Sequence, residues 1–202
     1  MQQDQIDALK REIQQCRICA ERFAATATTH EPRPVVWFNA KPRILVAGQA
    51  PGKRVHASGR PFTDPSGDRL RAWLGLSEKQ FYDLSQIAVV PSAFCFPGYD
   101  KKGADLPPPP VCARTWHDMV ASALGDVPLK VLVGGYAQKK HLQVSAPVTE
   151  LVRDWRSYAP HVFPLPHPSW RNNAWIKRNT WFEAELLPAL RTRVREVLKE
   201  RL

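Results

Sequence analysis

Short apolar runs typical of buried strands recur along the chain and alternate with segments of helical periodicity. The strand-like runs are residues 43–47, 87–90, 130–133 and 161–165. The segments with helical spacing are residues 68–76, 113–124, 136–142 and 148–153. Because strands that alternate with helices usually form a parallel sheet covered on both faces, this pattern predicts a three-layer α/β/α fold around a central, mainly parallel four-stranded sheet.

Both ends of the chain carry further helical patterns. Ile6, Leu9 and Ile13 recur at helical spacing, which predicts an amphipathic helix that runs into Cys16. Residues 176–202 also carry apolar side chains at roughly helical intervals, and we expect Pro188 to kink that helix because proline has no backbone N–H. A single domain over residues 1–202 is the default at this length.

Two loops follow the first and the last of the predicted strands. The segment Gly48-Gln49-Ala50-Pro51-Gly52 follows residues 43–47, and His167-Pro168-Ser169 follows residues 161–165. A glycine and proline loop by itself marks only a turn. In parallel sheets, however, ligands collect at the carboxyl ends of the strands, so we expect these two loops to form one site.

The net charge and the lengths of the apolar runs indicate which partners and which location to expect. The chain has 29 Lys and Arg against 19 Asp and Glu, a formal charge of +10, which favours a polyanionic partner, although an ordinary basic surface would look the same. No run approaches the roughly 20 apolar residues that span a bilayer, and the first residues do not resemble a secretory signal. We therefore expect a cytoplasmic protein without a membrane segment, and a monomer.

Four cysteines fall into one tight pair and two distant positions. Cys16 and Cys19 form Cys-x2-Cys, and Cys95 lies 17 positions before Cys112 across a loop rich in proline and glycine. Because a reducing compartment disfavours structural disulfides, this spacing suits a site of four thiolates that holds zinc or an iron–sulfur cluster. The four prolines at 107–110 predict a stiff arm that holds Cys112 at a fixed distance from Cys95.

Together these motifs resemble the uracil-DNA glycosylase superfamily, whose members pair a water-binding Gly-x-x-Pro loop with a His-Pro-Ser loop. The iron–sulfur branches, families 4 and 5, are the most similar, over about residues 16–188. The motifs that carry the resemblance are Cys16-x2-Cys19, Gly48-x-Ala50-Pro51-Gly52, Gly59-Arg60-Pro61-Phe62 and His167-Pro168-Ser169. The resemblance implies a [4Fe–4S] cluster on Cys16, Cys19, Cys95 and Cys112, with zinc less favoured.

Two departures bear on the catalytic residues. Family 4 places Glu after the first loop glycine, where this chain has Gln49, and an Asn that reads uracil four residues before the third cysteine, where it has Pro91. Residues 63–68 resemble the family 5 pattern Thr-Gly-Asp-Ala-Ser-Gly-Asp with one glycine missing, so Asp64 is the candidate catalytic carboxylate. The resemblance to family 5 implies looser base selection, including other deaminated bases.

Cleavage of an N-glycosidic bond builds positive charge on the sugar and negative charge on the departing base. Asp64 would supply the anion and position a water, with Gln49 as a second candidate for holding that water. The alternative is that Asp64 only opens a turn or caps the helix that begins near Gly67, a common use of aspartate before proline. His167 would donate a hydrogen bond to the base carbonyl.

The remaining candidates contact the flipped base or the DNA. Phe62 would stack on the extruded base, with Gly48, Ala50 and Ser92 around it. The candidates for contact with DNA are Ser169 on a phosphate, Trp170 or Arg171 in the gap left by the base, and Pro51 and Gly52. The implied function is a monofunctional glycosylase that flips uracil out of DNA and leaves an abasic site. The alternative is a non-catalytic protein that binds damaged DNA on the same fold.

Overall fold

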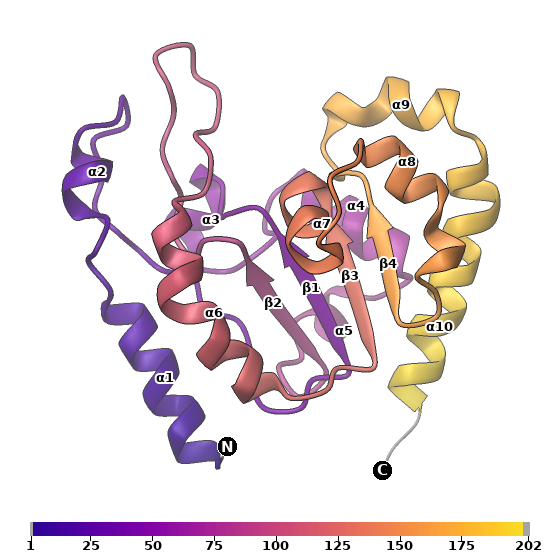
Figure 1. The fold of residues 1–202 in the computed structure, drawn as a ribbon, viewed down its shortest axis with the longest axis horizontal. Helices are drawn as coiled ribbons and strands as arrows, with labels where there is room; N and C mark the ends of the chain where they lie inside the picture. The colour runs from indigo at the N-terminus through magenta and orange to yellow at the C-terminus, as the bar shows by residue number, and fades with distance from the viewer. Residues whose placement is uncertain (1, 200–202) are drawn as a thin grey trace.

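A four-stranded parallel sheet forms the centre of the fold in the computed structural model, which describes residues 2–199 (Figure 1). The strands are β1 Ile44–Gly48, β2 Ile87–Pro91, β3 Leu129–Val133 and β4 Val162–Leu165. Their order is β2-β1-β3-β4, and each neighbouring pair is parallel. The predicted fold class is confirmed, and within the described residues this sheet is wholly parallel.

Helices cover both faces of the sheet because successive strand residues point to opposite sides. The helices are α1 Gln3–Gln15, α2 Ala20–Ala24, α3 Lys53–Ser58, α4 Pro65–Leu74, α5 Glu78–Phe81, α6 Pro110–Leu124, α7 Gly134–Leu142, α8 Val148–Arg153, α9 Asn173–Arg178 and α10 Leu187–Lys199. Leu45 and Val90 pack against α1 and α6, whereas Ile44 and Val46 pack against α4 and α10. No helix of the described residues is long and apolar enough to cross a membrane.

Several helix boundaries differ from the sequence pattern, and two of the differences bear on the site and on the C-terminal segment. Helix α4 begins at Pro65, three residues before the predicted start, because proline fits the first turn of a helix, where its missing N–H has no partner to lose. The predicted helix over 176–202 is interrupted: α9 ends at Arg178, and a π-helical turn at Phe182–Leu186 leads into α10. Pro188 thus lies in the first turn of α10, and residues 200–202 lie outside the described residues.

The parallel arrangement brings the loops that follow all four strands to one edge of the sheet, the upper edge in Figure 1. A long loop, residues 97–109, also rises at this edge between β2 and α6, and we call it the arm. The two loops singled out from the sequence therefore share the edge with the arm.

Candidate functional site

The first loop leaves β1 at Gly48 and is tied to the end of β2. The backbone N–H and the hydroxyl of Ser92 both donate to the Gly48 carbonyl, at 2.9 and 3.1 Å. The Ala93 N–H donates to the Gln49 carbonyl at 3.2 Å. Ser92, a predicted base contact, therefore uses its hydroxyl proton inside the protein and keeps its oxygen as an acceptor.

Beyond Gly48 the loop turns toward α3. Ala50 is half-buried and Pro51 is buried, while Gly52 is exposed and forms the N-cap of α3. Both predicted DNA contacts, Pro51 and Gly52, therefore lie at this edge, but only Gly52 is open to solvent.

Phe62 lies in a backbone conformation that phenylalanine rarely adopts, with a φ of 54°. Its carbonyl accepts hydrogen bonds from Arg71 Nη1 and from the Tyr82 hydroxyl, both at 3.0 Å. The half-buried ring packs edge to face on Phe81, with ring centroids 6.0 Å apart. Strain of this kind persists only where the surroundings over-determine it, so these contacts fix the position of the ring.

Gly67 of α4 permits this arrangement, because a Cβ there would lie 1.8 Å from the Phe62 carbonyl oxygen. We expect Gly67→Ala to lower the free energy of unfolding by roughly 2 kcal/mol or more, despite the better helix propensity of alanine. Urea denaturation measures this change. Gly48→Ala is the matched control, since a Cβ there meets no protein atom within 4 Å. Equal stability of the two variants would contradict the close packing.

Asp64 occupies the N-cap position of α4, but its side chain makes no capping hydrogen bond. The backbone carbonyl of Asp64 instead accepts from the Gly67 N–H at 2.8 Å. Asp64 thus opens the turn at this helix end through its backbone, as one of the alternatives had it, but its side chain does not cap the helix. The half-buried carboxylate is left without a structural task at this helix end.

His167 follows β4 by two residues, and its ring is oriented by its own loop. Nδ1 accepts a hydrogen bond from the Ser169 N–H at 3.2 Å, and the Asn172 amide donates to the His167 carbonyl at 2.7 Å. Because Nδ1 is the acceptor, the neutral ring carries its proton on Nε2, which can donate to a ligand. The residue is exposed, yet surrounding protein desolvates the ring and lowers its pKa, so it is neutral near pH 7.

Asp64 and His167 are brought together, since the Asp64 carboxylate acts on the His167 ring and raises its pKa, while Arg171 lowers it. Asp64→Asn should therefore lower the pKa of His167 further, because the favourable negative charge is lost. Arg171→Gln should shift it in the opposite direction and serves as the control. Titration of the His167 ring by NMR measures both shifts, and shifts of the same sign would contradict this arrangement.

Arg69, which the sequence analysis did not single out, joins α4 to the histidine loop. Its Nη1 donates to the Ser169 carbonyl at 3.2 Å and to the Asn173 side-chain oxygen at 2.8 Å. An arginine on a helix gives no sequence signal that distinguishes such a link from a solvated surface. Arg69 thereby holds the helix that begins after Asp64 against the loop that carries His167.

The same loop presents the predicted DNA contacts to solvent. Trp170 is 74% exposed, the highest exposure among the large hydrophobic side chains of residues 2–199, and Arg171 beside it is also exposed. Ser169 is half-buried, and its backbone groups are engaged by His167 and Arg69. An exposed tryptophan on a short 3-10 turn is suited to insertion into a ligand, because no packing has to be undone.

All four cysteines line one pocket beside α1 and α6, together with apolar side chains such as Phe23, Phe94 and Trp116. Burial raises the pKa of Cys95 to about 12 and that of Cys112 to about 11. Over residues 2–199, no group of three or more His, Cys, Asp or Glu side chains is arranged to hold a metal ion. The cysteines thus converge as the spacing predicted, but not as an assembled site for a single ion.

A family model described as the uracil DNA glycosylase superfamily matches residues 35–191. The matched region contains the whole sheet, both loops, and the residues Asp64 and His167. It includes Cys95 and Cys112 but begins after Cys16 and Cys19.

Proposed function

The chain belongs to the uracil DNA glycosylase superfamily, since the match covers most of its length, and from this premise we propose that it hydrolyses the N-glycosidic bond of uracil in DNA. One observation carries the proposal. The Asp64 carboxylate makes no capping hydrogen bond, and it lies close enough to the neutral His167 ring for its charge to raise the pKa of that ring. The carboxylate would stabilise the positive charge that develops on the sugar, and the neutral N–H donor would stabilise the negative charge on the departing base.

In the proposed step, a water held by Asp64 attacks the anomeric carbon of the sugar while the bond to the base nitrogen breaks. The bonding electrons leave with the base, and the Nε2–H of His167 donates to the base oxygen on which the negative charge develops. The proton of the water passes to Asp64, so the products are the anion of the base and an abasic sugar, and the base anion takes up a proton from solvent on release. Gln49, which is half-buried, would assist in holding the water.

Base flipping would deliver the substrate to this site. The fixed ring of Phe62 would stack on the extruded base, and Gly48, Ala50 and Ser92 would line its edge. Pro91 stands where family 4 has a uracil-reading Asn, so we propose that other deaminated bases are also accepted. Trp170 or Arg171 would fill the gap in the duplex, and Ser169 would contact a flanking phosphate.

The test is incubation of the protein with uracil-containing duplex DNA, followed by alkali. We expect alkali-labile sites at uracil and intact strands before alkali treatment, the behaviour of a monofunctional glycosylase. Duplexes with hypoxanthine or xanthine test the wider substrate range. Failure to release any of these bases would overturn the proposal, and damage-specific binding without release would favour the non-catalytic alternative.

We propose separately that Cys16, Cys19, Cys95 and Cys112 hold a [4Fe–4S] cluster. The shared apolar pocket supports this, because all four thiols line it and four cysteine thiolates are the usual ligands of such a cluster. When bound, such a cluster would cross-link the N-terminal segment to the base of the arm. Iron and sulfide analysis of the purified protein tests the assignment, and stoichiometric zinc without iron would overturn it.

A further inference from the structure

The arm, residues 97–109, is an ordered hairpin-like loop. The Asp100 N–H donates to the Ala104 carbonyl and the Leu106 N–H to the Gly98 carbonyl, both at 2.9 Å. The Asp100 carboxylate accepts from the backbone N–H groups of Lys102 and Ala104, at 2.8 and 2.9 Å. These bonds define the turn at the tip and occupy the carboxylate inside it.

The base of the arm is fixed as well. A Cβ on Gly98 would lie 2.8 Å from the Thr26 hydroxyl, so the arm packs closely on the segment that follows α2. The proline run ends in α6, with Pro110 as its first residue. The tip is therefore presented by a supported stalk.

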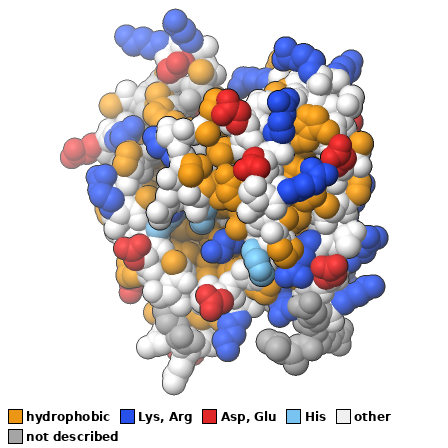
Figure 2. Space-filling model, turned by 45° about the vertical axis from the view of Figure 1, so that its right-hand side comes forward, with side chains coloured by type: hydrophobic (Ala, Val, Ile, Leu, Met, Phe, Trp, Pro, Cys, Tyr) orange, Lys and Arg blue, Asp and Glu red, His pale blue; other side chains and the backbone are white. Residues whose placement is uncertain are grey.

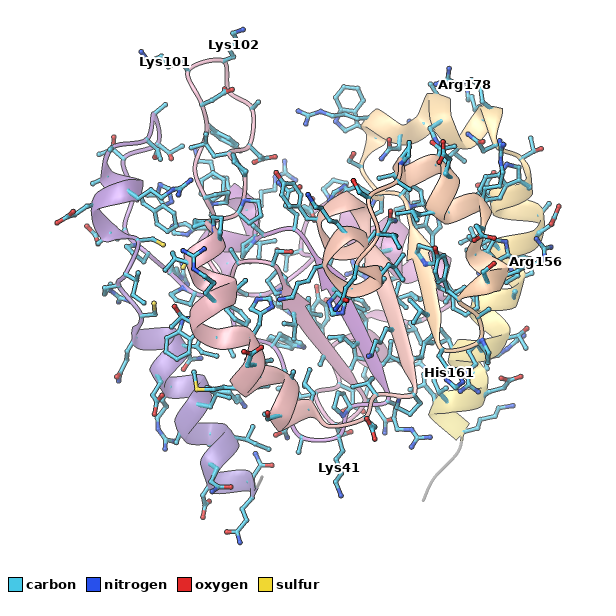
Figure 3. All side chains as sticks on the ribbon, in the orientation of Figure 1. Lys41, Lys101, Lys102, Arg156, His161 and Arg178 are labelled. Atoms are coloured by element: carbon cyan, nitrogen blue, oxygen red, sulfur yellow. The ribbon has the colours of Figure 1, made fainter. Side chains whose placement is uncertain are left out.

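Two cations are displayed at this tip. Lys101 and Lys102 are both exposed and project beyond the rest of the arm, and neither forms an ion pair within residues 2–199 (Figure 3). Asp105, on the returning segment, lies near enough to His167 for its charge to raise the pKa of that ring. The arm therefore borders the site while its lysines point away from the protein.

A second basic element lies at the other end of the same edge. Lys177 and Arg178 of α9 are exposed, and Arg178 and the two arm lysines lie at opposite ends of the upper edge in Figure 3. Figure 2 shows Lys and Arg side chains at both upper corners of the molecule, with a notch between them. Duplex DNA carries one negative charge per about 1.7 Å of its axis, so a duplex lying across this edge meets positive charge at both ends.

We propose that the arm is a second phosphate-binding element, which uses Lys101 and Lys102 to hold the duplex backbone on the flank of the lesion away from Trp170. This inference rests on the proposed function only in taking DNA as the substrate. It assigns to the arm a role that the mechanism of base release does not need.

The test compares Lys101→Gln/Lys102→Gln with the wild-type protein on a duplex that carries a stable abasic-site analogue, which cannot be cleaved. Each phosphate contact contributes about 0.9 to the slope of log K against log salt, so loss of both contacts should lower the slope by up to about 1.8. Raising the salt from 50 to 200 mM should therefore weaken DNA binding about tenfold more for the wild-type protein than for the variant. The rate of base release at saturating protein should not change.

Lys41→Gln/Lys79→Gln is the matched control. Both lysines are exposed, Lys41 just before β1 and Lys79 in α5, and Figure 3 shows Lys41 at the lower edge, at the end of the molecule away from the arm tip. Lys101→Arg/Lys102→Arg should keep the wild-type slope, because it preserves both charges. Trimming the duplex on the arm's flank should remove the difference between the wild-type and the Gln variant.

A wild-type slope in the arm variant, or an equal loss in the Lys41 and Lys79 control, would overturn the proposal. Loss of affinity confined to single-stranded DNA would also overturn it, since it would assign the lysines to an unpaired strand. Because binding is measured on an uncleavable duplex, failure of the wild-type protein to release uracil would count against the proposed enzyme and not against the arm.

Discussion

Asp64→Asn is expected to lower the single-turnover rate of uracil release by about 10²–10⁴-fold, the usual effect of losing a positioned general base. The substitution keeps the size of the side chain and removes its charge. Since Asp64 makes no capping hydrogen bond, stability should not depend on the carboxylate. The rate is measured with protein in excess over a uracil-containing duplex, and affinity is measured on the abasic-site analogue.

Asp118→Asn provides the control for a lost carboxylate. Asp118 is exposed on α6, in a groove with α1 that lies away from the strand ends. It should leave the rate and the affinity unchanged. If Asp64→Asn retained the wild-type rate, the water would have to be held by another group, and Gln49 would be the next residue to replace.

His167→Ala is expected to slow base release by about 10²–10³-fold, the cost of removing one donor to a developing anion. The ring is already neutral and oriented by the Ser169 N–H, so it does not have to reorient as negative charge develops on the base. The same single-turnover assay measures the loss.

His161→Ala is the control. His161 is exposed and precedes β4, so it lies at the end of that strand opposite to His167 and away from the site (Figure 3). His167→Gln keeps an N–H donor and should retain part of the rate. Equal rates for His167→Ala and His161→Ala would contradict the role of His167 as donor to the base.

The sheet and the meeting of its loops could be predicted from the sequence because their cause is local. Apolar runs such as residues 87–90 mark strands wherever they occur, and a parallel sheet brings the ends of its strands together. The interruption between α9 and α10 was missed because the apolar spacing continues across it. Spacing alone carries no information about the hydrogen bonds of the π-helical turn.

The supports of the site could not be predicted, because they join residues far apart in the chain. Arg69 and Ser169 are 100 positions apart, and no local pattern links a guanidinium to a distant carbonyl. The strained backbone of Phe62 requires a residue without a Cβ at position 67. Nothing in the sequence around Gly67 indicates this requirement. Tertiary packing, not propensity, decides these contacts. Convergence of the cysteines was foreseen from spacing, and the group they hold stays a prediction.

The peptide units around Ser169 have a consequence for the entropy of binding. The Ser169 N–H is held by His167 and its carbonyl by Arg69, so the backbone of the loop is fixed on both sides before any ligand arrives. Ordering one residue on binding costs about 1–2 kcal/mol, and a loop already ordered avoids this cost. The freedom lost at this loop on association would then belong to the exposed side chains of Trp170 and Arg171, and of these Trp170 is a rigid group with few rotamers.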